Sequence, residues 1–312
     1  MNELKVYETQ SELTIQDLNQ DLAASWIKYL DVKPKTAETY TRNIRPLFKY
    51  LQENGIAQPT REDILAFRDS LRETCKPATI QSYLAATRLF FQWTEQAKLY
   101  PNIATHIKGA KLTNEHRKDY LTSKQAANVL KTIDTSTLKG KRNYAIIALM
   151  LTSGLRTIEV SRANIADLRT AGDSSVLYIQ GKGHDEKDQY VKIAEPVEAA
   201  IREYFKARGS IAASEPLFVS TSNRNHNGRL TAHAIGLLSK GALKAAGYDS
   251  DRLTAHSLRH TAATLNLLNG GSLEETRQLL RHSSINTTLI YSHALERANN
   301  NSEIRVAKAI FG

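Results

Sequence analysis

The sequence predicts a mainly α-helical protein with an N-terminal helical bundle and a C-terminal α-rich domain that holds a small antiparallel β-sheet. Three observations support this. Apolar residues recur every three or four positions through the first third of the chain, a polar basic segment then interrupts the pattern, and helical patterns afterwards flank one pair of strand-like segments. The 312 residues are enough for two domains, and a hydrophobic content of 41% is ample for packed cores.

Four helices are predicted in the first third. The second opens near Thr36 and closes at Asn54, and Pro46 inside it predicts a kink or a shifted boundary. The third begins at Thr60, whose hydroxyl can cap it. The fourth follows Pro77, which suits a first helical position. Their apolar faces consist of Leu18, Leu22, Trp26 and Tyr29 in the first helix, Tyr40, Ile44, Phe48 and Leu51 in the second, Ile64, Phe67 and Leu71 in the third, and Ile80, Tyr83, Leu84, Phe90 and Trp93 in the fourth.

We expect residues 1–107 to form the helical domain, 108–118 a linker and 119–312 the second domain. The segment 108–118 is polar and basic without an apolar period, so it is either a linker lying along nucleic acid or a solvated loop. Of the formal net charge of +10, residues 1–120 carry +2 and residues 121–312 carry +8. This distribution favours a polyanionic partner for the second domain, with a basic enzyme of another kind as the alternative.

The elements of the second domain follow from capping and periodicity signals. Serine or threonine followed three residues later by glutamate or glutamine predicts two helix starts. Two short β-rich segments joined by a polar turn predict a hairpin. The expected elements are a helix from Thr122 with Gln125 in its capping box, a buried helix Asn143–Leu151, strands Val176–Gln180 and Tyr190–Ile193, a helix Ala255–Leu268, and a helix from Ser272 with Glu275 in its capping box toward Leu280.

The composition predicts a cytoplasmic protein. Cys75 is the single cysteine, so no internal disulfide can form and a reducing compartment fits. The start of the chain has no apolar signal core. The longest apolar run, Tyr144 to Leu151, is too short to span a membrane.

Residues suited to phosphate chemistry gather near the C-terminus. His256, Arg259 and His260 are spaced i, i+3, i+4, which places them on one face of a helix. Arginine offers a fixed fork to phosphate oxygens, and histidine moves protons near neutral pH. The two histidines also have the spacing of a zinc pair, but Arg259 would set a cation beside a cation. We therefore expect an anion and no metal.

Four further residues could complete a site. Arg156 and Glu159 lie one turn apart after an apolar helix, so the carboxylate could orient the guanidinium, although such pairs are often surface ion pairs. Lys182 stands between two glycines in the predicted hairpin and can reach a ligand, although turns often contain such residues. Tyr291 is the one tyrosine of 13 that follows the His/Arg motifs at this distance. Together these residues indicate metal-free phosphodiester cleavage by a tyrosine nucleophile.

These motifs resemble the catalytic pattern of the tyrosine recombinases of the phage integrase family. The match comprises the arginine segment Thr152–Val160, the His-x-x-Arg-His of residues 256–260, the Leu-x-His of residues 280–282 and a tyrosine nine residues later, in that order and at that spacing. Residues from about 14 to 107 resemble the SAM-like helical core-binding domain of the family.

The resemblance implies the tyrosine recombinase fold and a site-specific enzyme that cleaves and rejoins duplex DNA through a covalent 3′-phosphotyrosine, without cofactor or metal. Integration, excision and dimer resolution are all compatible with it. The implied roles are nucleophile for Tyr291, phosphate binding for Arg156 and Arg259, a further hydrogen bond from His282, general base for His256, acid for Lys182, and support from Glu159 and His260.

The resemblance also implies the partners, which are double-stranded DNA with inverted-repeat core sites, accessory proteins and a homo-tetramer. Ile304, Ala307, Ile310 and Phe311 share a helical face at the C-terminus. This face could dock on its own domain or, as is common in the family, on a neighbouring protomer. The early start of the core-binding domain leaves no room for a separate arm-site domain, which favours a simple Xer-like member.

Two departures from the family pattern affect the expectations. Arg281 stands where the family usually has glycine, so it is expected to add a side chain and a charge near the phosphate and to alter the local backbone. Lys187 competes with Lys182 for the acid role, and Lys182 is preferred. Three alternatives stay open: a type IB topoisomerase-like enzyme that relaxes DNA as a monomer, a non-catalytic DNA-binding protein that forms no covalent adduct, and a metal phosphoesterase that uses the histidines.

Overall fold

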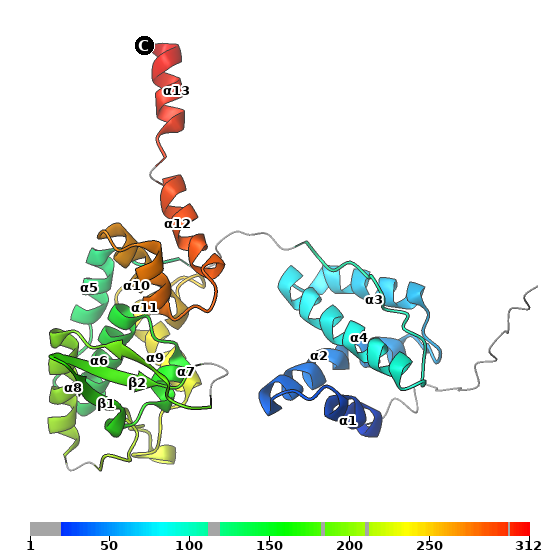
Figure 1. Ribbon diagram of the computed structural model, residues 1–312, viewed down its shortest axis with the longest axis horizontal. Coiled ribbons are helices and arrows are strands. Elements are labelled where there is room, and N and C mark those ends of the chain that lie inside the picture. The colour runs from blue at the N-terminus through cyan, green and yellow to red at the C-terminus, as the bar shows by residue number, and fades with distance from the viewer. Residues whose placement is uncertain (1–19, 112–118, 182–184, 210–211, 299) are drawn as a thin grey trace, which may run out of the picture. The chain divides into compact units, whose positions relative to one another are not determined.

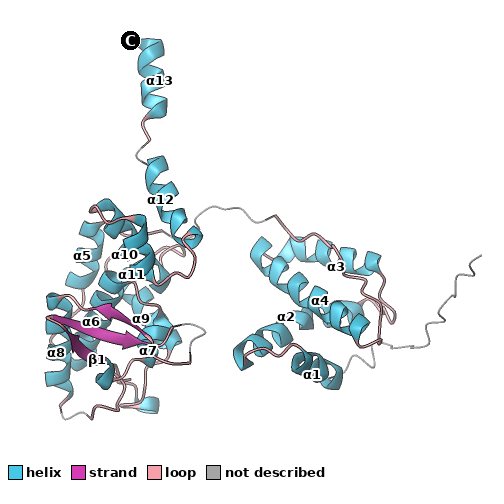
Figure 2. Cartoon of the chain, in the orientation of Figure 1, coloured by secondary structure: helices cyan, strands magenta, loops and turns pink. Residues whose placement is uncertain are grey.

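The computed structural model divides the chain into two compact units, Met1–Asn114 and Glu115–Gly312. It describes residues 20–111, 119–181, 185–209, 212–298 and 300–312. These segments are mainly helical and contain one small sheet, as the sequence predicts (Figure 2). The boundary between the units falls among residues 112–118, outside the described segments, so the 108–118 linker stays a prediction. Over the described segments, no helix combines the length and apolar character needed to cross a bilayer.

The N-terminal unit is built from four helices among its described residues. Its core contains the predicted apolar residues of the four helices except Tyr29, which is 50% exposed, and Leu18, which lies outside the described residues. The rings of Trp26 and Phe90 pack edge-on in this core with centroids 5.5 Å apart. The helices are α1 (Gln20–Tyr29), α2 (Pro34–Glu53), α3 (Arg61–Thr74) and α4 (Pro77–Gln96) (Figure 1).

Helix α2 departs from its prediction at two prolines. It begins at Pro34, two residues before the predicted start, because proline suits the first helical turn, where no N–H partner is needed. It then runs unbroken through Pro46, so the helix tolerates the missing N–H at that position. The burial of Leu47 and Leu51 on the far side of Pro46 stabilises this continuation.

Side-chain caps begin several helices where the sequence predicts them. The backbone N–H of Thr60 donates to Asp63 Oδ2 at 2.7 Å, and Thr60 Oγ1 in return accepts from the Asp63 N–H. The same reciprocal box joins Thr122 to Gln125 and Ser272 to Glu275. Each box satisfies two N–H groups that a helix start otherwise leaves unpaired.

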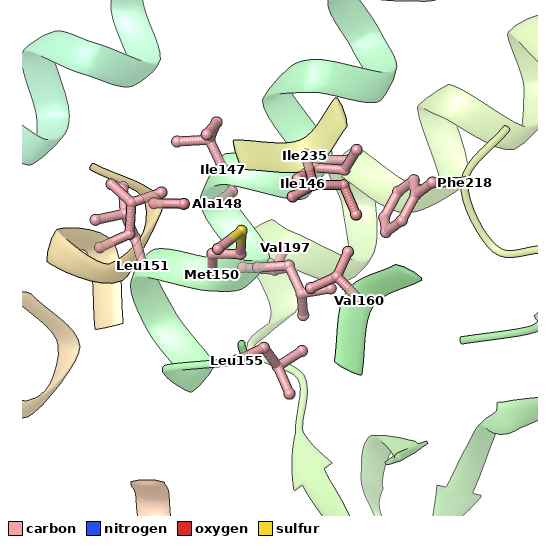
Figure 3. Packing of buried hydrophobic residues seen from close by; sticks show 14 of the residues in the cluster. Ile146, Ile147, Ala148, Met150, Leu151, Leu155, Val160, Val197, Phe218 and Ile235 are labelled. Atoms are coloured by element: carbon pink, nitrogen blue, oxygen red, sulfur yellow. The ribbon is translucent and has the colours of Figure 1, made fainter. Parts of the chain in front are cut away.

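The C-terminal unit surrounds α6 (Leu138–Ser153), which is apolar on almost every face and packs against α8 and α10. The predicted buried helix Asn143–Leu151 is its central part. Figure 3 shows Ile146 and Met150 of α6 gathered with Val197, Phe218 and Ile235. The other helices are α5 (Ser123–Lys131), α7 (Thr157–Arg162), α8 (Glu195–Arg208), α9 (Ala232–Ala245), α10 (Ala255–Leu268), α11 (Leu273–Leu280), α12 (Asn286–Ala298) and α13 (Ser302–Phe311), with 3₁₀ turns η2 (Ile165–Asp167) and η3 (Asn223–Asn225).

The sheet is antiparallel with strand order β1-β2-β3. The predicted hairpin corresponds to β2 (Ser174–Ile179) and β3 (Gln189–Lys192), with Leu177 opposite Val191. Strand β1 (Leu168–Ala171) was not predicted, because three of its four residues are exposed and it lacks an apolar alternation. Pairing with β2, a tertiary interaction, is what defines it as a strand.

Candidate catalytic site

The predicted site residues that the structure describes come from three parts of the C-terminal unit, which the fold brings together. Helix α10 carries the histidine–arginine motif and packs against α6, α11 and α12. Arg156 lies just after α6, His282 between α11 and α12, and Tyr291 on α12. The packing of α10 therefore joins motifs that lie up to 135 positions apart in the sequence.

Gly154 shapes the turn that leads from α6 to Arg156. It ends α6 in the left-handed conformation, at φ 59°, where side chains are disfavoured. A Cβ at this position would also lie 2.8 Å from Leu280 Cδ2, so a larger residue would require the buried Leu280 side chain to move. The turn directs the Gly154 carbonyl toward Arg259, whose Nη1 donates to it.

Arg156 and Glu159 form the ion pair that their spacing predicts. Arg156 caps α7, its backbone N–H donates to Glu159 Oε2 at 2.8 Å, and its Nη1 donates to Oε1 at 2.8 Å. The Glu159 carboxylate is 1% exposed, whereas the Arg156 side chain is 30% exposed. The pair is thus anchored in the interior, and the guanidinium reaches the surface of a cavity.

Arg259 is a buried cation held by backbone carbonyls. It is 1% exposed and donates from Nη1 to the Gly154 carbonyl and from Nη2 to the Leu280 carbonyl. Burial, reinforced by the nearby charges of Arg156 and Arg281, lowers its pKa to about 9. The guanidinium therefore keeps its charge at neutral pH.

Aromatic rings connect the histidine motif to the candidate nucleophile. His256 is exposed at the start of α10, and its ring centroid lies 4.5 Å from that of buried His260. The His260 ring in turn lies 5.2 Å from the ring of Tyr291. His260 therefore contacts both groups, which suits the supporting role implied for it.

Tyr291 is 4% exposed and packs with Ala263 and Leu280. Burial raises the pKa of its phenol, and the opposing charges of Arg259 and Arg156 lower it by less. The two arginines thus favour the phenolate, but the loss of solvation outweighs them in this conformation. The proton on Tyr291 has to be removed during attack.

His282 is 8% exposed, and its Nδ1 lies 2.9 Å from Thr288 Oγ1. Burial and the charges of Arg259, Arg156 and Arg281 lower its pKa to about 4, so the ring is neutral at pH 7. The sequence analysis did not include Thr288. Its position one turn before Tyr291 on α12 is a spacing signal that could have identified it.

Arg281, which stands where the family usually has glycine, adopts a backbone conformation that glycine favours. It caps α11 in the left-handed region, at φ 55°. Its side chain is 6% exposed and donates from Nη2 to Glu159 Oε2 at 3.0 Å. The structure thus places the side chain and the charge of Arg281 beside Glu159 and Arg156, the latter expected to bind the phosphate.

Of the two candidate lysines, the structure describes only Lys187. Lys182 lies outside the described residues. Lys187 forms an ion pair with the carboxylate of Asp167, which is itself buried and accepts the Asn164 N–H at 2.6 Å. Lys187 is thereby tied to the 3₁₀ turn η2.

Two cavities open beside Arg156. One, of about 480 Å³, is lined by Arg156, His256 and Arg259 together with His233 and Lys240 of α9. The other, of about 240 Å³, is lined by Arg156, Arg281 and His282 together with Gly181 and Gln189. The residues described as lining them include no carboxylate, and over the described chain no group of three or more His, Cys, Asp or Glu residues could hold a metal ion. This arrangement suits an anion such as a phosphodiester.

Comparisons with known proteins match both units. The model of the phage integrase family matches residues 119–297, and that of the phage integrase N-terminal SAM-like domain matches residues 22–100. Tyrosine recombinase XerD of Listeria monocytogenes is 27% identical over 291 residues, covering 89% of this chain and 94% of that protein. Tyrosine recombinase XerC of Caldanaerobacter subterraneus subsp. tengcongensis is 31% identical over 232 residues, covering 73% and 62%.

Solved structures show the same fold. XerH recombinase in a post-cleavage complex with palindromic difH substrate aligns with a TM-score of 0.70 at 21% identity, covering 89% of this chain and 82% of that one. A lambda integrase tetramer bound to a Holliday junction aligns with a TM-score of 0.69 at 18% identity, covering 91% and 78%.

We predict that the His282 ring stays neutral well below pH 6. The difference between the ordinary pKa of 6.5 and about 4 corresponds to about 3 kcal/mol of preference for the neutral ring in the fold. Because the unfolded chain takes up this proton at higher pH, the fold loses stability as pH falls from 6.5 to 4. An NMR titration of the histidine signals measures the pKa of His282, and the variant His282→Gln assigns its signal. Protonation near pH 6.5 would contradict the prediction.

Proposed function

The chain belongs to the phage integrase family of tyrosine recombinases, and on this premise we propose that it is a site-specific recombinase that cuts and rejoins duplex DNA through Tyr291. Members of this family are generally enzymes that cleave and rejoin DNA. The observation that carries the proposal is that Arg156, Arg259 and His256 line one cavity, while buried Tyr291 lies close enough for the charges of both arginines to act on its phenol. Integration, excision and dimer resolution would all use this chemistry.

Arg156 and Arg259 would hold the non-bridging oxygens of the scissile phosphate. Both line the larger cavity, and each is oriented by bonds that leave it little freedom, to Glu159 in one case and to two backbone carbonyls in the other. Fixed cations stabilise the second negative charge that builds on phosphorus during attack without having to reorganise. His282 adds a hydrogen bond from Nε2 when Thr288 donates to its Nδ1.

The chemical step would be a transesterification. Tyr291 Oη attacks phosphorus as His256 accepts the phenolic proton, and the bond from phosphorus to the 5′ oxygen breaks as Lys182 protonates the leaving oxygen. The products are a 3′-phosphotyrosyl link and a 5′-hydroxyl. Because one phosphate ester replaces another, the reverse reaction on a second strand needs no external energy source. A base is required because burial raises the pKa of Tyr291.

Helix α13 favours assembly of several protomers. No residue of this helix is buried, and Ile304, Ile310 and Phe311 are 67%, 67% and 84% exposed. Apolar surface of this kind commonly marks a protein interface. A lambda integrase relative forms a tetramer on a Holliday junction. We propose that α13 packs on a neighbouring protomer in a DNA-bound tetramer, which distinguishes the chain from a monomeric topoisomerase-like enzyme.

We predict that Tyr291→Phe abolishes the protein–DNA adduct and leaves duplex binding unchanged, since only the attacking oxygen is lost. A nicked substrate that traps the cleaved strand, followed by denaturing gel electrophoresis, measures the adduct. Tyr190→Phe is the matched control, because Tyr190 is half exposed on β3. Adduct formation by Tyr291→Phe would exclude Tyr291 as the nucleophile, and a wild-type chain that binds but never forms an adduct would indicate a non-catalytic DNA-binding protein.

We predict that Lys182→Met slows cleavage and that a 5′-bridging sulfur in the scissile phosphate restores it. A thiol has a pKa of about 8.5, far below that of an alcohol, so a thiolate leaves without a proton donor. Lys187→Met is the control and should cleave at the wild-type rate, because Lys187 is paired with Asp167. Rescue by sulfur of Lys187→Met instead would assign the acid role to Lys187.

We predict that the double variant Ile310→Asp/Phe311→Asp binds one DNA site as tightly as the wild type but fails to form the two-site tetramer. The added charges oppose burial of α13 against another protomer. Sedimentation velocity with labelled DNA distinguishes the assemblies. Lys308→Ala on the same helix is the control. Tetramers that persist in the double variant would place the exchange surface elsewhere.

A further inference from the structure

The guanidinium of Arg281 ties together three segments of the site. Its Nη1 donates to the carbonyls of Leu279 at 2.6 Å and Ser153 at 3.3 Å, and its Nη2 donates to the Gly154 carbonyl at 3.3 Å and to Glu159 Oε2 at 3.0 Å. These acceptors belong to the end of α6, to α7 and to α11. One side chain thus bridges the turn that presents Arg156 to the turn that presents His282.

The backbone conformation at position 281 does not favour arginine over other residues. A left-handed helix cap favours glycine or asparagine, and Arg281 adopts it at φ 55° despite its Cβ. What arginine adds over those residues is therefore its side chain and its charge. Both are directed into the site, where the side chain is 6% exposed.

Glu159 is the acceptor that Arg281 shares with Arg156. Its Oε1 accepts from Arg156 Nη1, and its Oε2 accepts from Arg281 Nη2 and from the Arg156 backbone N–H. Both oxygens are thus occupied by donors that approach from different elements. This fixes the plane of the carboxylate and with it the direction of the Arg156 guanidinium.

The charges give Arg281 a second effect. If Arg156 alone faced Glu159, the pair would be neutral, and little of the Arg156 charge would act on a phosphate. Arg281 adds a second cation to this carboxylate, so Arg156, Arg281 and Glu159 together carry a net charge of +1, and nearby Arg259 raises the net charge of the four groups to +2. A phosphodiester acquires a second negative charge as it is attacked, so this net charge matches the transition state.

We propose that Arg281 is a positioning residue that neutralises Glu159 and thereby leaves the charge of Arg156 available to the DNA phosphate. The proposal rests on the proposed function, since it concerns how the recombinase site binds the phosphate under attack. It assigns Arg281 a role through Glu159 and Arg156, with no contact to the DNA required.

The pH dependence of cleavage reports on this role. The charged groups that face Glu159 are Arg156 on its own helix, Arg281 from the end of α11 and Arg259 from α10. Burial alone would raise the pKa of Glu159, but the charge of Arg281 is the largest opposing influence, and together with the contacts of Arg156 it holds the pKa below the ordinary value. Without Arg281 the pKa of Glu159 rises, so the carboxylate becomes protonated, and cleavage is lost, at a higher pH than in the wild type.

The test compares single-turnover cleavage of a nicked duplex by Arg281→Asn, Arg281→Gly and Arg281→Lys across pH 5 to 9. Asparagine and glycine both suit the left-handed backbone, so their effects report the lost side chain. Lysine keeps the charge without the fork. Arg202→Asn is the control, because it removes an exposed arginine that pairs with Glu198 on α8.

We expect Arg281→Asn and Arg281→Gly to bind duplex DNA as tightly as the wild type and to cleave it about 100-fold more slowly, as misplacement of a reacting partner by about 1 Å can do. The acid limb of their pH profiles should move to higher pH, while Arg281→Lys keeps the wild-type limb. In a Glu159→Gln background, Arg281→Asn should reduce the cleavage rate by a much smaller factor than it does alone, because both changes remove the same interaction.

Wild-type rates and an unchanged acid limb in both variants would overturn the proposal, as would an effect of Arg281→Asn that is equally large in the Glu159→Gln background. Loss of DNA binding by both variants would also overturn it, since Arg281 would then be needed for folding. A wild-type chain that forms no adduct would instead contradict the proposed function itself. Arg202→Asn is expected to match the wild type throughout.

Discussion

The candidate site depends on keeping several guanidiniums of like charge close together in a largely buried space. Burial of a cation is unfavourable unless donors find partners, and like charges at short range repel. Backbone carbonyls solve much of this problem, since Gly154 accepts from both Arg259 and Arg281 and Leu280 accepts from Arg259. The left-handed turn at Gly154 is what aims its carbonyl there, so a single backbone conformation connects the end of α6 to the charge of the site.

The same concentration of charge explains the resting protonation states. His282 is held neutral because burial and three nearby arginines all disfavour its cation. Tyr291 keeps its proton because burial outweighs the arginines. The arginines of the site therefore keep a net positive charge beside two neutral groups, because Glu159 balances only part of their charge. Under the proposed function, a DNA phosphate that enters the cavity would balance this charge, which would couple DNA binding to readiness for attack.

Much of the fold could be predicted from local signals, because capping boxes and apolar periods are encoded within a few residues. The Arg156–Glu159 pair was accessible for the same reason. Three features could not be predicted in this way: strand β1, the contact of Thr288 with His282, and the hydrogen bonds of Arg281. Each depends on a partner outside the local motif or on a backbone conformation that the residue type does not indicate. The choice between the lysines likewise turns on Asp167, whose pairing with Lys187 only the folded chain reveals.

The central claim is that one phenol oxygen temporarily holds the broken strand. Mass spectrometry of the trapped adduct after proteolysis and nuclease digestion tests it most directly, because it identifies both the modified residue and the linkage. We predict a single modified peptide in which Tyr291 carries a nucleotide through its 3′-phosphate. A nucleotide on any other residue, or one attached through a 5′-phosphate, would contradict this account.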